Sequence, residues 1–155
     1  MLSAVDLFEN SHKTELAVEF LQRVVELQSL HLGPVSTSTL SSQHLLADLH
    51  VASGTYTSAE SVMKVALGNC LAALGQSHES TIEWLEELCK LYTLLDNLPT
   101  ALLMADTSLS ACVDVFGGTH VRTLAAIDRY ARLLRDSGQL CESKELFEQC
   151  LQLGF

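Results

Sequence analysis

Apolar residues recur three and four positions apart through most of this chain, with polar residues between them. This spacing places apolar side chains on one face of an α-helix. Within residues 76–117, one such series runs from Ile82 to Leu95 and a second from Leu98 to Phe116. The whole pattern predicts helices at residues 1–11, 14–31, 37–53, 56–74, 79–95, 98–116, 121–137 and 140–153.

The helical pattern returns every 42 residues. Three series of identical residues keep this interval: Gly33, Gly75 and Gly117; Thr39, Thr81 and Thr123; and Ala17, Ala59 and Ala101. Internal repeats of about 20–50 residues are typical of solenoids, in which each unit buries its apolar face by stacking on its neighbours. The repeat therefore predicts the architecture and favours a binding function over a catalytic one.

A residue suited to a tight turn separates the two helices of each repeat. Gly54, Asp96 and Gly138 occupy this position at intervals of 42 residues. A helix commonly ends at a residue in the left-handed conformation, which suits glycine best and Asn or Asp next. Pro99 falls in the first turn of the following helix, where the missing N–H is not needed. Each repeat is therefore predicted to be two antiparallel helices.

The repeated positions also carry a family resemblance. In the middle unit they are Leu74-Gly75, His78, Thr81-Ile82, Leu98 and Ala101. This pattern resembles the 42-residue tetratricopeptide repeats (TPR) found in kinesin light chains. The resemblance covers essentially the whole chain and implies an all-α fold, a right-handed α-solenoid of antiparallel helix pairs with about three and a half repeats. Ser36 in place of the repeat histidine, Asp96 in place of the turn glycine and Ser143 in place of the helix-contact alanine are departures compatible with that fold.

We expect residues 1–155 to form a single repeat domain, with repeats at about 1–33 (partial), 34–75, 76–117 and 118–155. The first helix begins late relative to the repeat and no polar capping helix follows the last one, although solenoid ends usually need one. The chain is therefore expected to be a piece of a longer array or to self-associate through its helix ends. Apolar residues expected to be exposed there are Leu2, Val5, Phe147, Leu151 and Phe155. Because residue 1 is a methionine, the interpretation that the chain is a full protein stays open.

The charge and hydropathy of the chain limit the classes of partner that we expect. The net charge of −10 argues against nucleic acid, because phosphate binding needs clustered Lys and Arg. We expect no membrane span and no signal peptide, because no apolar stretch is long enough and the N-terminus lacks a basic segment before an apolar one. Residues 76–117 carry seven acids against Lys90 alone, which suits either a partner with a basic segment or simple solvation of helix faces.

Five cysteines without a CxxC spacing argue against a disulfide framework or a zinc site. Cys70, Cys89, Cys112 and Cys150 lie among apolar residues, which predicts buried free thiols in a reducing compartment and hence a cytoplasmic protein.

No catalytic motif is present, so we expect no enzyme, no cofactor and no metal. His78 and His120 precede helix starts, which predicts a capping or turn-packing role. His44 and His50 with Asp48 leave a metal site conceivable, but the histidines are six residues apart and so point to different sides of one helix. Trp84 is expected to pack in the core, with an exposed anchor for a partner as the alternative.

The family resemblance implies that a peptide would lie along the wall formed by the first helix of each pair. The non-core positions expected on that wall form three sets: His44, Asp48 and Val51; Glu86, Lys90 and Thr93; and Asp128, Arg132 and Arg135. The charged residues and His44 are the candidate partner-binding residues. The family commonly presents Asn near the first position of each set, whereas this chain has His44, Glu86 and Asp128. Their charges would orient a peptide with its basic part on Glu86 and its acidic part on the arginines. The alternative is that they are solvated or paired within a helix, as Asp128 and Arg132 would be at a spacing of four.

The leading interpretation is a non-catalytic protein-interaction module, a scaffold or adaptor that receives a protein or peptide partner on its concave face. The alternative is a structural segment of a longer TPR array or assembly, acting as a spacer or self-associating through uncapped ends.

Overall fold

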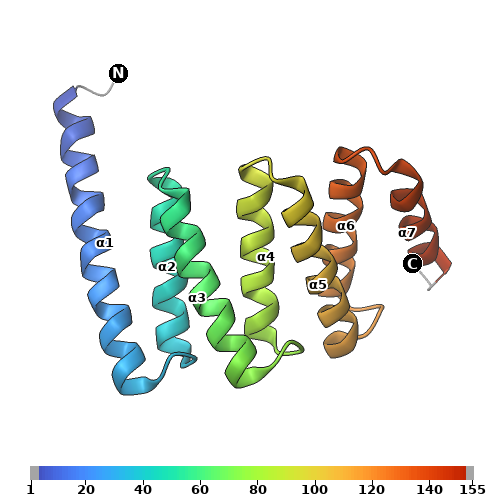
Figure 1. The fold of residues 1–155 in the computed structure, drawn as a ribbon, viewed down its shortest axis with the longest axis horizontal. Coiled ribbons are helices and arrows are strands. Elements are labelled where there is room, and N and C mark those ends of the chain that lie inside the picture. Colours follow the sequence, from blue (N-terminus) through green and yellow to red (C-terminus); the bar gives the residue numbers. More distant parts are fainter. Residues whose placement is uncertain (1–3, 153–155) are drawn as a thin grey trace. The chain divides into compact units, whose positions relative to one another are not determined.

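The computed structural model describes residues 4–152, and the side chains of residues 10–139, 141–146 and 148. In that part of the chain all regular elements are α-helices (Figure 1). They are α1 (Ala4–Leu32), α2 (Thr37–Ala52), α3 (Tyr56–Leu74), α4 (Glu79–Leu94), α5 (Leu98–Phe116), α6 (Val121–Asp136) and α7 (Leu140–Gln152). The predicted all-α repeat fold is confirmed. The side chains expected to be exposed at the chain ends, and that of Cys150, lie outside the described ones.

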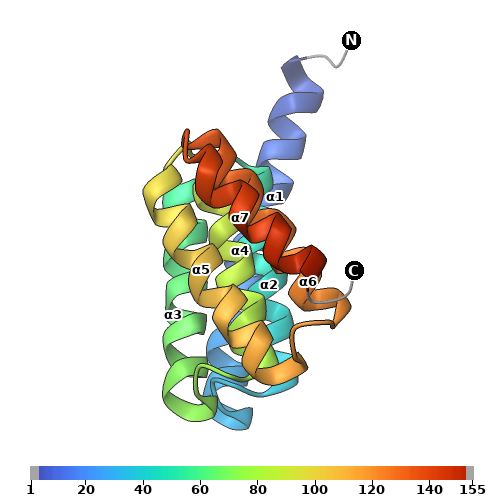
Figure 2. The same ribbon diagram turned by 90° about the vertical axis from the view of Figure 1, so that its right-hand side faces the viewer.

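The chain divides into two compact units, residues 1–69 and 70–155. In the first unit α1 packs against α2, and in the second α5 packs against both α4 and α6 while α7 packs against α6 (Figures 1 and 2). The boundary falls within α3. The assignment of residues 1–155 to a single domain stays a prediction.

The predicted break between helices 1–11 and 14–31 is wrong, because α1 runs without interruption through these residues. The equivalent turn position in later repeats is left-handed, with φ of 75° at Gly54 and 56° at Asp96. Forty-two residues before Gly54 the chain has His12, for which that conformation costs about 1–2 kcal/mol. The helix therefore continues, and the Thr14 hydroxyl donates to the carbonyl of Asn10 at 2.8 Å across the expected break.

The recurring glycine and threonine form one turn structure that is repeated three times. Gly33, Gly75 and Gly117 end the preceding helix with φ of 97°, 86° and 82°. Six residues later the fully buried Thr39, Thr81 and Thr123 donate their hydroxyls to those glycine carbonyls at 2.8, 2.7 and 2.7 Å. Each turn therefore satisfies a carbonyl that the end of the helix leaves without an intrahelical partner.

The residue before each of these helices acts as an N-cap. The Nδ1 atoms of His78 and His120 accept from the backbone N–H groups of Ser80 and Arg122, both at 3.2 Å. Ser36 does the same for Thr39 through its hydroxyl, at 3.2 Å. The predicted capping role of the two histidines is confirmed, and serine fills it because hydroxyls are good N-caps.

Small buried residues lie where the paired helices of the second unit meet. The Cys89 thiol donates to the carbonyl of Ala101 at 3.5 Å, between α4 and α5. One repeat later the Ser143 hydroxyl donates to the carbonyl of Ala131 at 2.9 Å, between α6 and α7. Both hydrogen bonds join equivalent positions of their repeats, so the departure from alanine at Ser143 adds a contact to the same packing.

Trp84 on α4 is fully buried, which confirms its predicted core role and rules out the exposed anchor. Among the described helices α5 is long and apolar enough to cross a membrane by length and composition. About 28% of this apolar stretch is buried inside the structure, and the buried residues of α5 are Ala101, Ala105, Ser108, Ala111 and Cys112.

Candidate functional site

A groove of about 590 Å³ runs between α4 and α6 in the second unit. Its lining residues are Lys90, Thr93 and Leu94 from α4, and Arg129, Arg132, Leu133 and Asp136 from α6. Both helices are the first of their pairs, as the sequence analysis expects of a binding wall. Lys90 and Arg132, two of the predicted site residues, face this groove.

Three cations, Lys90, Arg129 and Arg132, line the groove together with one acid, Asp136. Each of the three cations is paired with an acid just outside the lining. Lys90 pairs with Glu87 on its own helix at 2.6 Å, and its side chain is 59% exposed. Arg132 pairs with Asp128 at 2.9 Å and is 65% exposed, which confirms the spacing-of-four pair expected from the sequence. Exposed pairs of this kind contribute about 0–1 kcal/mol, so both cations can exchange their partners at little cost.

The groove also offers apolar surface. Leu94, the last residue of α4, is 57% exposed, whereas Leu133, which also lines the groove, is buried. An apolar side chain beside exposed cations is the combination from which peptide sites are built, because apolar contacts contribute affinity and charges contribute orientation.

Glu86, expected to contact a partner, is paired with residues of the chain itself. Its carboxylate oxygens lie 3.4 Å from the Arg129 guanidinium and 3.6 Å from that of Arg122, and the side chain is only 15% exposed. Arg122 also binds Glu79 at 2.7 Å. A basic partner segment at Glu86 would have to displace two arginines of the chain itself. We call these four residues, Glu79, Glu86, Arg122 and Arg129, the α4–α6 ion cluster.

Aromatic rings extend this cluster. The Arg122 guanidinium carbon lies 5.3 Å from the centre of the Phe116 ring, a distance at which a cation is attracted by the ring face. Phe116 in turn stacks on His120, with ring centres 4.7 Å apart. The start of α6 is thereby tied to the end of α5, and the ion cluster ties it to α4.

A second hollow of about 300 Å³ lies between α6 and α7. Its lining residues are Asp128, Ala131, Arg132, Arg135 and Ser143. Arg132 lines both this hollow and the α4–α6 groove. The Arg135 guanidinium lies 3.2 Å from the Asp136 carboxylate. The structure therefore brings together Glu86, Lys90, Asp128, Arg132 and Arg135 in the second unit.

The remaining two predicted site residues, His44 and Asp48, are on α2 in the first unit. Asp48 is exposed and His44 is partly buried. Among the described residues no three His, Cys, Asp or Glu side chains are placed to hold a metal ion.

A third hollow, of about 640 Å³, lies between α1 and α2 in the first unit and is lined in part by Glu15, Glu19 and His50. His50 is buried, and its Nδ1 lies 2.9 Å from the Thr55 hydroxyl oxygen. Burial lowers the pKa of His50, which favours the neutral ring.

Three of the predicted buried thiols, Cys70, Cys89 and Cys112, are free and buried as expected. Burial raises the pKa of each one, which keeps the thiol protonated and unreactive. Cys141 is free and exposed.

The ion cluster was not expected from the sequence, although the sequence contains a signal for it. Glu79 and Glu86 are seven residues apart, and Arg122 and Arg129 follow them by 43 residues each. A spacing of one repeat plus one residue brings side chains from successive first helices to face each other. Leu94 and Asp136 of the groove lining carry no comparable signal, because they differ from core or solvent positions only in the packed structure.

Solved structures with a similar fold include TPR-like repeats of a putative kinesin light chain. The putative kinesin light chain TPR-like repeats of Podosopora anserina match with a TM-score of 0.76 and 25% identity, over 94% of this chain and 69% of that chain. A single-substitution variant of that protein matches with a TM-score of 0.75. BtubC (BKLC) of P. vanneervenii gives a TM-score of 0.75 at 14% identity, over 94% of this chain and 58% of that chain, which is a likeness of fold alone. No protein-family model and no curated protein matches the chain.

Proposed function

Because the chain is a tetratricopeptide-like repeat protein of the kinesin-light-chain type, we propose that it is a scaffold or adaptor that binds an acidic peptide segment in the α4–α6 groove. Such repeats generally form protein-interaction scaffolds and are typically non-catalytic. The observation that carries the proposal is the groove lining, where Lys90, Arg129 and Arg132 lie beside exposed Leu94.

Binding begins with an exchange of ion pairs. A peptide carboxylate takes Lys90 from Glu87 and another takes Arg132 from Asp128, and Arg132 can accept its new partner with two parallel hydrogen bonds. An apolar peptide side chain between them covers Leu94. Charge sets the direction of the peptide and the apolar contact contributes most of the affinity.

The α4–α6 ion cluster supports this mode of binding. It joins α4 to α6 at Glu86, within one helical turn of Lys90, and it holds Arg129 at the edge of the groove. A groove whose walls are fixed before binding loses less entropy when the peptide enters. Glu79 and Glu86 of the middle repeat therefore hold α4 to α6, and this proposal replaces the expected basic partner segment with an acidic one.

The test uses two fluorescein-labelled ten-residue peptides, one with a Glu-Glu-Leu-Glu centre and one with Lys-Lys-Leu-Lys, measured by fluorescence anisotropy against the full chain. We expect the acidic peptide to bind and the Lys90→Glu, Arg132→Glu double variant to weaken it by at least about tenfold. Lys64→Glu is the matched control, because Lys64 on α3 is 58% exposed and pairs with Glu60 on its own helix, as Lys90 does with Glu87. Equal loss in the control, or tighter binding of the basic peptide, would reject the groove as an acidic-peptide site.

A cytoplasmic location belongs to the same proposal, because buried Cys70, Cys89 and Cys112 remain free thiols. The alternative role as a structural segment of a longer array predicts that the acidic peptide does not bind and that the α4–α6 variants behave as the wild type does.

A further inference from the structure

The long helix α1 carries a row of large apolar side chains that nothing in the described structure covers. Leu16, Phe20, Leu27 and Leu30 are 53%, 69%, 57% and 78% exposed. The α1 side chains that are partly buried, such as Leu21, Val24 and Gln28, lie elsewhere on the helix circumference. The exposed row therefore lies away from the face that α1 turns towards α2. We call it the outer seam of α1.

The spacing of the outer seam is that of a helix-packing surface. Leu16, Phe20, Arg23, Leu27 and Leu30 follow one another at steps of four, three, four and three residues. This alternation keeps the side chains on one stripe and is the pattern by which two helices pack along their lengths. An isolated exposed leucine needs no explanation, whereas four large apolar side chains in register on one helix do.

The seam is not a general property of the repeats. The positions 42 residues later, on α3, are occupied by Ser58, Val62, Asn69 and Ala72. The chain has smaller or polar residues there, and larger apolar ones on α1. The row of large apolar side chains is therefore present on α1 and not at the equivalent positions of α3.

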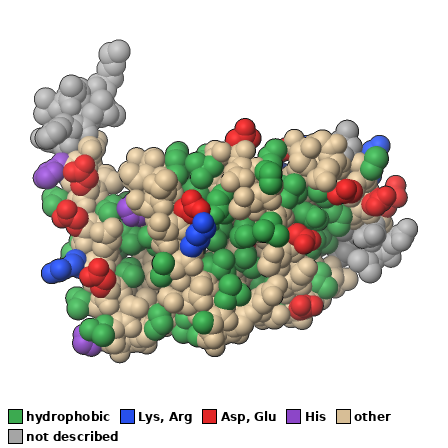
Figure 3. All heavy atoms as spheres, viewed as in Figure 1, with side chains coloured by type: hydrophobic (Ala, Val, Ile, Leu, Met, Phe, Trp, Pro, Cys, Tyr) green, Lys and Arg blue, Asp and Glu red, His purple; other side chains and the backbone are tan. Residues whose placement is uncertain are grey.

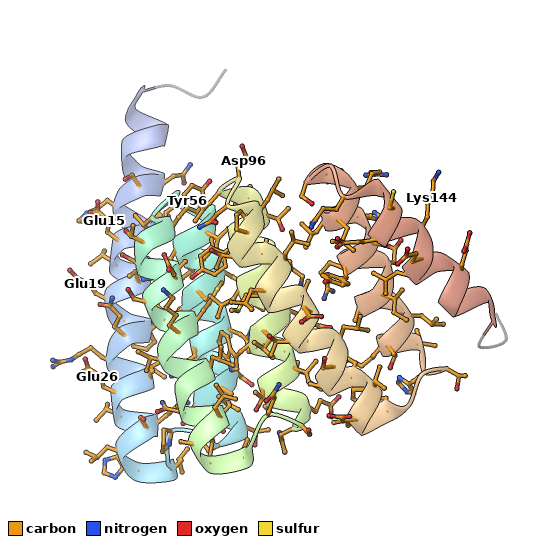
Figure 4. All side chains as sticks on the ribbon, turned by 45° about the vertical axis from the view of Figure 1, so that its right-hand side comes forward. Glu15, Glu19, Glu26, Tyr56, Asp96 and Lys144 are labelled. Carbon is orange, nitrogen blue, oxygen red and sulfur yellow. The ribbon has the colours of Figure 1, made fainter. Side chains whose placement is uncertain are left out.

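Acidic residues line one side of the seam. Glu15, Glu19 and Glu26 are all exposed on one flank of α1 (Figure 4). This flank lies between the seam and the face turned towards α2, so Glu15 and Glu19 also border the hollow between α1 and α2. On a helical projection they follow one another along the flank next to Leu30 and Arg23. Figure 3 shows hydrophobic and acidic side chains next to one another along the outer edge of α1.

We propose that the outer seam of α1 docks an amphipathic helix from a partner protein, whose own apolar stripe is flanked by Lys or Arg. The partner's apolar residues cover Phe20 and the leucines, and its basic flank faces Glu15, Glu19 and Glu26. The three carboxylates attract this basic flank locally, over about a Debye length, and so favour its orientation and association.

The same charges argue against a second copy of this chain as the occupant. In an antiparallel pair of α1 helices, Glu19 of one copy would face Glu26 of the other, since both lie on the same flank. In a parallel pair, Arg23 would meet Arg23 within the seam. Like charges directly opposed weaken both arrangements, and a basic helix removes the conflict in either direction.

The experiment uses the full chain and two labelled 21-residue peptides, each with Leu at heptad positions a and d. One peptide carries Lys at positions e and g, and the other carries Glu there. We expect the Lys peptide to bind, and Phe20→Ser to raise its Kd by at least about tenfold. Glu19→Lys with Glu26→Lys is expected to weaken binding and to make it less sensitive to salt. Val65→Ser on α3 is the control, because Val65 is also 59% exposed but lies outside the seam.

All substituted side chains are exposed, so circular dichroism and the melting temperature should match the wild type and exclude unfolding as the cause. Three results would overturn the proposal. The first is equal binding of the Lys and Glu peptides, and the second is the same loss in Val65→Ser as in Phe20→Ser. The third is a concentration-dependent dimer that Phe20→Ser abolishes, since the seam would then serve self-association.

Discussion

The α4–α6 ion cluster makes a quantitative prediction, because one carboxylate serves two arginines. Replacing Glu86 with Gln keeps the shape of the side chain and removes its charge. Arg122 and Arg129 would then be left with little compensation, although each is only 25% exposed. Arg129 loses more charge compensation, because Glu86 is its only acidic partner in the cluster, whereas Arg122 keeps its ion pair with Glu79.

The size of the effect follows from distance and burial. At 3.4 and 3.6 Å each pair has a gross attraction of about 4–5 kcal/mol at an effective dielectric constant of about 20. Most of this is offset by the desolvation of the charges, and breaking a fully buried pair costs about 3–5 kcal/mol. Because Glu86 is 15% exposed, we expect Glu86→Gln to lower the free energy of unfolding by about 1–2 kcal/mol. For a chain of this size, that corresponds to a fall in Tm of about 3–6 °C.

The assay is urea and thermal unfolding followed by circular dichroism, with Glu87→Gln as the control. Glu87 is the next residue on α4 and pairs with exposed Lys90, so its loss should change the free energy by less than about 0.5 kcal/mol. A double-mutant cycle of Glu86→Gln with Arg129→Gln should give a coupling energy of about 1 kcal/mol. Equal effects of Glu86→Gln and Glu87→Gln, with no coupling to Arg129, would refute the reasoning.

Three further predictions concern the turns and His50. Asp96 is held at φ 56°, so Asp96→Gly should raise the free energy of unfolding by about 0.5–1 kcal/mol in urea titration, and a loss would mean that the aspartate side chain stabilises the turn. Thr81→Val removes the hydroxyl that donates to Gly75, and should cost about 1–2 kcal/mol, whereas exposed Thr57→Val should be nearly neutral. Because the pKa of His50 is lowered in the folded state, the unfolded state binds the proton more readily. The contribution of His50 to stability is therefore fully present above pH 6.5 and is lost as the pH falls from there through the folded-state pKa. His50→Gln should flatten this part of the pH profile of the free energy of unfolding, and an unchanged slope would mean that other groups cause it.

The features that the sequence predicted best are local. The three Gly–Thr turns and the caps at His78 and His120 depend on residues within about six positions of one another, so their chemistry is visible in the one-dimensional pattern. The break expected near residue 12 was wrong for the same kind of local reason. The repeat period suggested a turn, but His12 does not favour the left-handed conformation that Gly54 and Gly138 adopt.

The candidate site was predicted only in part, because it depends on contacts between repeats. Lys90 and Arg132 were expected on the wall and do line the groove. The role expected for Glu86 depended on its being accessible, and only the packed structure reveals that Arg122 and Arg129 enclose it. The outer seam of α1 was likewise not visible in advance, since its leucines follow the same helical spacing as core residues.

The most direct test of the proposed groove is photo-cross-linking of the acidic ten-residue peptide to the full chain. A benzoyl-phenylalanine is placed at Leu94 in one variant and at Leu103 in another, because these side chains are 57% and 59% exposed on α4 and α5. If the peptide lies in the α4–α6 groove, it cross-links at position 94 and not at position 103. Cross-linking at position 103 alone, or no cross-link at position 94 under conditions in which the peptide is bound, would contradict the account.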